Sequence, residues 1–119
     1  MFSRAPSVEA QPEVELSNWS IIKVWFKNGK QEHVFIGNRG EGFRISTNIV
    51  QYEKADRQGK TTSGRVYKLI DQPVEMNEQN ELWPYWESWL QMYAAGDWKD
   101  VSLNLLSTKV VVQEKRDAN

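Results

Sequence analysis

The sequence predicts an α+β fold: an antiparallel sheet of four to five strands, arranged as a meander of two hairpins, with one main helix packed on a face. Three observations predict it. Residues 19–26 are dense in β-branched and aromatic residues, which is typical of a strand. Asn28-Gly29 follows, the favoured pair for a two-residue hairpin turn. Residues 82–93 hold three of the six tryptophans and two of the four tyrosines, at helical spacing.

The length of 119 residues predicts a single domain, with expected limits at residues 18 and 113. Residues 1–17 are rich in Pro, Ser and Glu, and we expect them to form a disordered arm. Residues 114–119 are polar and charged, which predicts a C-terminal tail.

The first strand is predicted to lie at the centre of the sheet. Its alternate residues place Ile22, Val24 and Phe26 on one face, and Trp19, Ile21 and Trp25 on the other. Because both faces are largely apolar, we expect a strand that is covered on two sides. If Asn28-Gly29 forms the turn, the return strand at 31–36 pairs Ile22 with Phe35 and Val24 with His33.

The next elements are separated by glycine-rich and polar segments. Residues 37–42 contain three glycines without the spacing or the Lys-Ser/Thr pair of a phosphate loop, so we expect these glycines to supply positive φ angles. We expect a third strand at 43–52, a polar turn at 53–60 and a fourth strand at 61–70. Pro73 lacks a ladder donor and ends that last strand.

The helix must start near Pro84, because proline is tolerated only in a first turn. The N-cap is therefore expected between Asn80 and Trp83, with Asn80 or Glu81 preferred, and Gly96 is expected to stop the helix after Ala94-Ala95. The apolar residues cover an arc of about half the helix. We expect the centre of this arc in the core: Leu82, Trp86, Trp89, Leu90 and Tyr93.

The margins of the arc are candidate interface residues: Trp83, Tyr85 and Met92. Their burial is left open by the pattern, and exposed Trp and Tyr are enriched at interface hot spots. Residues 101–113 alternate in part, and whether they add an edge strand is also left open.

Charge is unevenly distributed, although the net charge is only −1 and the pI about 5.9. Residues 39–68 hold seven bases and three acids, hence +4, while residues 69–100 hold seven acids and one base, hence −6. Such runs are usually solvated or meet across the fold. The alternative is an anion- or partner-contacting patch on the basic region, with these candidates: Arg39, Arg44, Lys60 and Arg65. For Arg65, a pairing with a helix carboxylate such as Glu87 competes with that role.

Several classes of chemistry lack the residues they need. There is no cysteine and only one histidine, His33, which we expect to be an ordinary sheet residue rather than a metal ligand or catalytic base. We therefore expect neither an enzyme nor a bound cofactor or metal. No segment has the apolar length of a signal peptide or a membrane span, so we expect a cytoplasmic protein without membrane contact.

Four motifs together resemble a group of small uncharacterised proteins from proteobacterial chromosomes and their phages. They are Ile45-Ser46-Thr47-x-Ile49-Val50, Thr62-Ser63-Gly64-Arg65-Val66-Tyr67-x-Leu69, Tyr85-Trp86-x-x-Trp89 and Asp100-Val101-Ser102. The resemblance covers residues 19–103. Similar proteins often have Gly-Pro-Pro where this chain has Asp71-Gln72-Pro73. The resemblance implies a bacterial or phage origin and brings no known activity or residue role.

The sequence lacks a recognisable set of catalytic residues and has more aromatic residues than one helix needs for its core face. Together these two features predict a small non-enzymatic protein-interaction module. A phage- or prophage-encoded modulator of a host protein fits this expectation, with the partner and the oligomeric state left open. The alternative is a nucleic-acid-associated regulator that uses the basic 39–68 region and binds less tightly as salt rises. It is the weaker hypothesis, because stacking platforms for bases usually lie beside basic residues, whereas these aromatics lie on an acidic helix.

Overall fold

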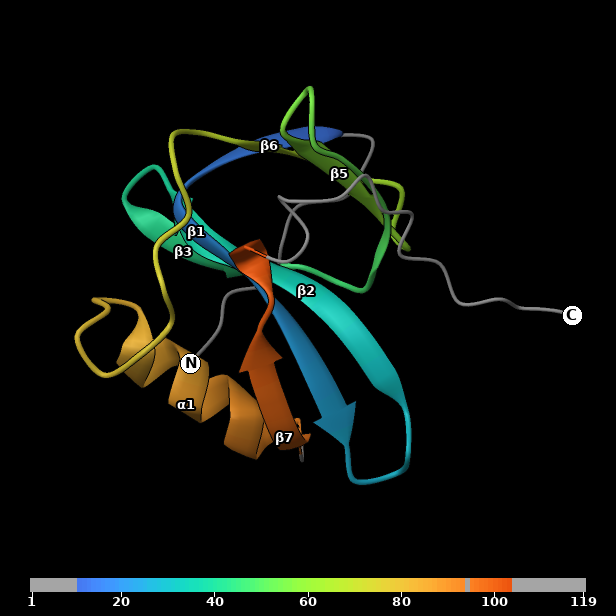
Figure 1. Cartoon of the computed structure of the whole chain (residues 1–119), viewed down its shortest axis with the longest axis vertical. Coiled ribbons are helices and arrows are strands. Elements are labelled where there is room, and N and C mark those ends of the chain that lie inside the picture. Colours follow the sequence, from blue (N-terminus) through green and yellow to red (C-terminus); the bar gives the residue numbers. More distant parts are fainter. Residues whose placement is uncertain (1–10, 94, 104–119) are drawn as a thin grey trace, which may run out of the picture.

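Figure 1 shows the computed structural model of the chain, which describes residues 11–93 and 95–103. Its elements are, in chain order, β1 (Glu13–Phe26), β2 (Gln31–Arg39), β3 (Gly42–Ile45), β4 (Ile49–Glu53), β5 (Gln58–Thr61), β6 (Val66–Leu69), α1 (Trp83–Met92) and β7 (Ala95–Asp100). The strands form one seven-stranded sheet in the order β3-β2-β1-β6-β5-β4, with β7 also paired to β1. The α+β class is confirmed. The antiparallel meander of four to five strands is wrong, because β1 pairs with β6 in parallel.

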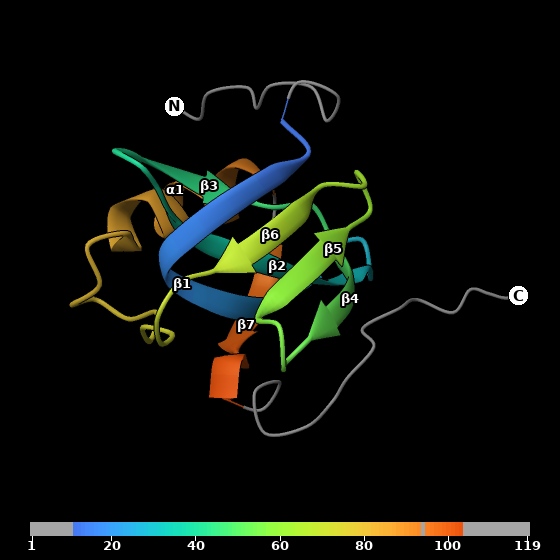
Figure 2. The ribbon, with the colours of Figure 1, turned by 90° about the horizontal axis from the view of Figure 1, so that it is seen from above.

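Strand β1 belongs to two parts of the sheet. Residues 13–16 pair with β6, and the stretch from Ser20 onward pairs antiparallel with β2 and β7. The change of partner occurs at a bend, where Asn18 has a φ of 47° and the β1–β2 register shifts. Figure 2 shows β1 curving around the sheet beside β6. Residues 13–17, expected to belong to the N-terminal arm, are therefore strand, because Val14 and Leu16 are buried in the core.

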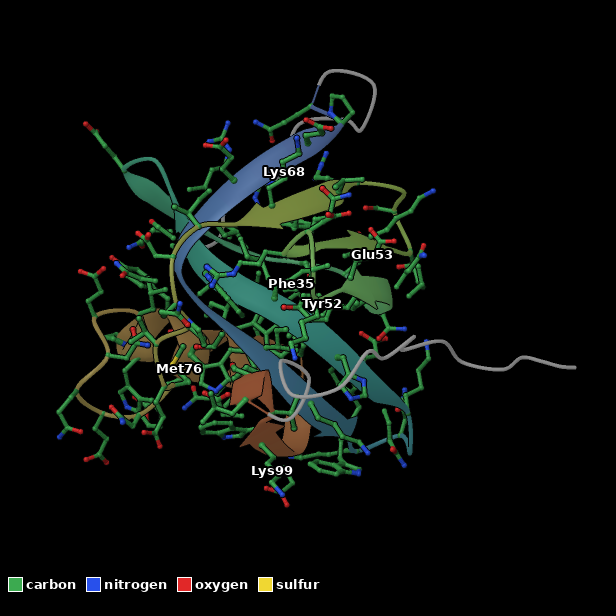
Figure 3. All side chains as sticks on the ribbon, turned by 45° about the horizontal axis from the view of Figure 1, so that its top comes forward. Phe35, Tyr52, Glu53, Lys68, Met76 and Lys99 are labelled. Carbon is green, nitrogen blue, oxygen red and sulfur yellow. The ribbon has the colours of Figure 1, made fainter. Side chains whose placement is uncertain are left out.

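The fold has three layers, and an apolar cluster fills each of the two spaces between neighbouring layers. One cluster fills the space between β4–β6 and the β1–β2 layer; there Phe35 and Tyr52 face each other across 6.4 Å (Figure 3). The other lies between the β1–β2 layer and α1, centred on Trp86. The two faces of β1 enter different clusters, as the sequence predicts: Trp19 and Ile21 the first, Ile22 and Val24 the second. Each fully buried side chain of this size contributes about 1.5–3 kcal/mol.

The hairpin between β1 and β2 has a three-residue loop, not the predicted two-residue turn. The Phe26 N–H donates to Lys30 O (2.8 Å), and the Gly29 N–H donates to Phe26 O (2.9 Å). Gly29 has a φ of 95°, the conformation that this longer loop requires. The register consequently slips by one residue from the prediction, so that Ile22 pairs with Val34 and Val24 with Glu32.

The predicted third strand at 43–52 is divided in two. β3 ends at Ile45, and β4 begins at Ile49 in the other layer. The side chains between them replace a strand partner for β2: Ser46 Oγ accepts from the Phe35 N–H (2.9 Å), and Asn48 Oδ1 accepts from the His33 N–H (2.8 Å). These two side chains let the chain leave the sheet without leaving buried donors of β2 unpaired.

The predicted fourth strand at 61–70 and the predicted polar turn at 53–60 also need correction. β5 already includes Gln58–Thr61, and β6 begins only at Val66. Between them is a tight turn in which the Gly64 N–H donates to Thr61 O (2.8 Å) and Gly64 has a φ of 90°. The hydroxyls of Thr61 and Ser63 lie 3.0 Å apart in this turn. The Thr-Ser-Gly-Arg motif is thus a turn between two strands.

The start of α1 lies within the predicted range, and its end does not. The N-cap is Leu82, between Asn80 and Trp83 but not one of the two preferred residues, and Asn80 Oδ1 accepts from the Leu82 N–H (2.8 Å) in the turn before the helix. The helix ends at Met92, before the expected stop at Gly96. The reason is β7, a strand that the sequence did not predict; it begins at Ala95 and pairs with β1.

The chain after β7 is tied to the sheet. The Val101 N–H donates to Ile21 O (2.8 Å), and Ser102 Oγ accepts from the Ile21 N–H (2.8 Å). Asp100 accepts from Ser102 and, through its other oxygen, from the Met76 N–H (2.9 Å). Met76 thereby lies against the helix layer (Figure 3). Residues 104–113, which include most of the possible edge strand, lie outside the described residues.

Gly59 is expected to tolerate no side chain. A Cβ at this position of β5 would lie 2.4 Å from Cζ of the fully buried Phe35 ring. Gly59→Ala should therefore lower the free energy of unfolding by about 1–3 kcal/mol, the usual range for an overpacked core. Urea denaturation of both proteins measures the difference.

Gly42→Ala is the matched control, since the nearest atom to its added Cβ is 3.9 Å away. It should change stability by no more than about 0.5 kcal/mol. Equal effects of the two substitutions would contradict the packing of Phe35 against β5.

Candidate functional site

The three candidate interface residues of the helix have different environments. Tyr85 is 48% exposed and Met92 is 53% exposed. Trp83 is only partly exposed, because its ring packs against Trp98 of β7 at 6.0 Å between centroids. Tyr93 was expected in the core, yet 52% of it is exposed. The other residues of the expected core arc are buried or partly buried.

Tyr85, Met92 and Tyr93 form one surface, which we call the exposed aromatic surface. Met92 follows Tyr85 by seven residues, about two helical turns, so these two side chains lie on one side of the helix; Tyr93 comes next, at its C-terminal end. The Tyr85 ring stacks on Phe43 of β3, with 4.3 Å between centroids and 22° between planes. β3 pairs only with β2 among the described strands, so this surface lies beside a sheet edge.

A groove of about 450 Å³ adjoins this surface at the C-terminal end of α1. Phe26, Trp89 and Tyr93 supply its aromatic wall, and Lys30 and Glu32 of the β1–β2 hairpin supply its charged groups. We call it the aromatic groove. The sequence pattern did not identify it, because its residues come from β1, β2, β3, α1 and the loops between strands, which meet only in the fold. The position of Tyr93 in the last helical turn was the one available signal.

The four candidate basic residues do not gather at one place. Arg39 lies at the tip of the β2–β3 hairpin and Lys60 on β5, with β2, β1 and β6 between β3 and β5 in the strand order. Arg65 is only 5% exposed. Arg65 Nε donates to Gln11 O (2.8 Å), next to β1, whereas the Glu87 side chain with which a pairing was expected as the alternative is exposed on α1.

Arg44 and Arg65 share Gln11 as a partner. Arg44 Nη2 donates to Gln11 Oε1 (3.1 Å), while Arg65 holds the carbonyl of the same residue. Lys68, a further member of the basic region, lies 3.2 Å from Glu13. These cations therefore attach the start of β1 to β3 and β6, a structural use of residues that were candidates for contact with an anion.

Glu81, just before the helix, is held by two amide side chains. Glu81 accepts from Asn18 Nδ2 (3.1 Å) and Asn38 Nδ2 (2.7 Å). Two ion pairs are seen among the described residues, Lys30 with Glu32 and Lys68 with Glu13, and neither includes a carboxylate of residues 69–100. Six of the seven acidic side chains of that region are exposed to solvent.

The described residues contain no constellation that suggests catalysis. No group of three or more His, Asp or Glu side chains could hold a metal ion among them. His33 lies in β2 opposite Lys23, as expected for a sheet residue. No described helix has the length and apolar character needed to cross a membrane.

Comparison with protein-family models, with curated proteins and with solved structures finds no match to this chain. The resemblance to small phage and proteobacterial proteins therefore stays a prediction, and any functional inference depends on the geometry described above.

The pKa of Tyr52, a core residue, is shifted in the folded protein. Burial raises this pKa above its ordinary value of 10.0, opposed by the positive charge of Arg57. The hydroxyl is buried and has no hydrogen-bond partner among the described residues. The folded state consequently holds the phenol proton more tightly than the unfolded chain. This contribution to stability is complete below pH 10 and is lost as the pH rises through the folded pKa.

Tyr52→Phe should therefore be tolerated at pH 7 and should stabilise the fold by up to about 1 kcal/mol, since an unpaired hydroxyl no longer has to be buried. The variant should also lose less stability than the parent between pH 9 and pH 11. Urea denaturation across this range measures both effects. A variant markedly less stable than the parent at pH 7 would mean that the hydroxyl has a partner.

Proposed function

We propose that this chain is a small non-enzymatic protein-interaction module that binds its partner through the exposed aromatic surface. The observation that carries the proposal is the exposure of Tyr85 and Met92 on one side of α1 and of Tyr93 at its end. Large amphipathic rings supply much contact area for little loss of conformational entropy, and methionine adapts to irregular partner surfaces.

This surface is supported by a difference between the two margins of the helix in how they are covered. On one margin of the helix, Trp83 is covered by Trp98, and on the other margin Tyr85 lies over Phe43 at the edge of the sheet. The Phe43 stack holds the Tyr85 ring in place before binding, which lowers the entropy lost on complex formation. Tyr85 is thus a preorganised contact next to two exposed and apolar side chains.

The partner we propose is a protein of the bacterial host, in keeping with the resemblance to phage and prophage proteins. A nucleic-acid role gains no comparable support, because Arg65 is buried and both Arg44 and Arg65 hold Gln11. Cytoplasmic location and the absence of enzymatic activity are parts of the same proposal.

Substitution of Tyr85 and Met92 tests the proposal. The tagged chain is used to capture proteins from bacterial lysate, the captured protein is identified by mass spectrometry, and its affinity is then measured with purified components. Tyr85→Ala and Met92→Ala should each weaken binding by more than about fivefold, as expected of hot-spot residues. Loss of the Phe43 stack by Tyr85→Ala should lower stability by only about 0.5–1.5 kcal/mol.

Val74→Ala is the matched control, because Val74 is 38% exposed and lies outside the exposed aromatic surface. It should leave the affinity unchanged, and thermal unfolding should show that all three variants are folded. Unchanged affinity of both surface variants would overturn the assignment. Sedimentation of the chain alone is the second control: self-association abolished by Met92→Ala would identify a second copy as the occupant.

A further inference from the structure

The aromatic groove has a wall of three rings in mutual contact. Phe26 and Trp89 meet edge to face at 6.0 Å, and Trp89 and Tyr93 lie 5.2 Å apart at 41°. Trp89 is held from behind by a parallel stack on the fully buried Trp86 at 5.1 Å. The wall is therefore built on the core, and only Tyr93 is largely exposed. The faces of such rings carry negative potential and attract cations.

The electrostatics of the groove point to the same class of ligand. It lies where α1 ends, and the last turn of this helix contains no basic residue. The C-terminal end of a helix carries partial negative charge, which favours a nearby cation. Glu32 adds a carboxylate from β2 to the lining of the groove.

Lys30 is the one cation among the described residues of this lining. Its Nζ lies 3.9 Å from Glu32 Oε2; the Lys30 side chain is 71% exposed, and the Glu32 side chain is 25% exposed. A contact this long from an exposed lysine contributes little, because solvent screens it and the lysine must be held in place. Glu32 can therefore give up Lys30 for a better-placed cation.

Two of the polar residues that line the groove are already engaged. Ser46 Oγ accepts from the Phe35 N–H and donates to Thr47 O (2.7 Å). Asn48 accepts from the His33 N–H through its side chain and from the Thr62 N–H through its carbonyl oxygen (2.8 Å). Of the remaining lining, the rings and the Glu32 carboxylate are the groups that suit a cation.

We infer that the aromatic groove binds an arginine side chain of a basic segment in the partner protein. A guanidinium is flat enough to stack on Trp89 or Tyr93 and presents a fork of N–H donors to the Glu32 carboxylate, which the ammonium of lysine does not. Glu32 is the one acidic residue among the described residues that line the groove, and it supplies the charge complementary to a guanidinium. This inference deepens the proposed function and rests on it, because it names the chemistry of the partner.

The test is an NMR titration of the full-length ¹⁵N-labelled chain with three capped pentapeptides. Each has two glycines on either side of a central arginine, lysine or citrulline; citrulline keeps the shape of arginine and removes its charge. The arginine peptide should shift the indole N–H signal of Trp89. The lysine peptide should bind more weakly, and the citrulline peptide should bind at least about tenfold more weakly.

Substitutions of residues that line the groove should change the affinity for the arginine peptide in directions that a nonspecific electrostatic attraction does not predict. Glu32→Gln should weaken binding of the arginine peptide about tenfold. Lys30→Gln should strengthen it, because the internal competitor is removed. Tyr93→Leu should weaken it while keeping most of the apolar area. Glu53→Gln, which removes an exposed carboxylate of β4 that is not part of this groove, is the matched control and should have no effect (Figure 3).

Three outcomes would overturn the inference: no binding of the arginine peptide, equal binding of arginine and citrulline peptides, or equal weakening by Glu32→Gln and Glu53→Gln. The proposed function fails separately, through unchanged partner affinity of the Tyr85 and Met92 variants. If those variants lose partner affinity but the arginine peptide does not bind, the proposed interaction module stands and the proposed arginine site is rejected.

Discussion

The remaining structure depends on one constraint, which is that β1 is apolar on both faces and each face needs its own cover. A single strand that is apolar on both faces must be covered twice, since leaving either face in water would forfeit the burial of several large side chains. Trp19 and Ile21 are covered by the β4–β6 layer, and Ile22 and Val24 by α1. The three layers therefore follow from the composition of one segment.

The bend of β1 also determines where the helix lies. At the bend, the Trp19 indole donates to the carbonyl oxygens of Ile70 (3.1 Å) and Asp71 (3.2 Å), and the Val74 N–H donates to Trp19 O (2.8 Å). The segment leaving β6 is thereby led across the sheet to its opposite face (Figure 1). Asn18 and Asn38 then hold Glu81, just before the helix. The position of the helix, and with it the aromatic groove, depends on these contacts with the bend.

Local patterns predicted the elements that have a strong local signal. The central strand, the helix and the α+β class follow from periodicity and apolar density, which act within a short window. The parallel pairing of β1 with β6 has no such signal, because it joins residues 13–16 to a strand about fifty residues later. β7 was missed because Trp98 is its only large apolar side chain; its remaining contribution is backbone pairing with β1. The hairpin register depended on one extra loop residue, a difference that the Asn28-Gly29 pair alone does not encode.

The candidate sites were less predictable than the fold, because exposure depends on what lies next to a residue. Arg65 follows a glycine in a turn motif and reads as surface from its sequence, but the chain entering β1 covers it. Some apolar residues of the helix are exposed for the opposite reason, because no neighbouring element covers them. The apolar arc covers about half of the helix, which is wider than the sheet face that it meets.

The excess of apolar surface is divided unequally between the two margins. β7 rises beside one margin and covers Trp83 through Trp98, whereas the other margin extends past β3, the last strand on that side of the sheet. The uncovered residues therefore collect at a single place, between the sheet edge and the end of the helix. That place adjoins a groove lined by rings, beside a carboxylate whose only described ion pair is loose. Exposed rings beside a carboxylate that is only weakly paired are the basis on which we propose a basic protein segment, rather than a purely apolar one, as the partner.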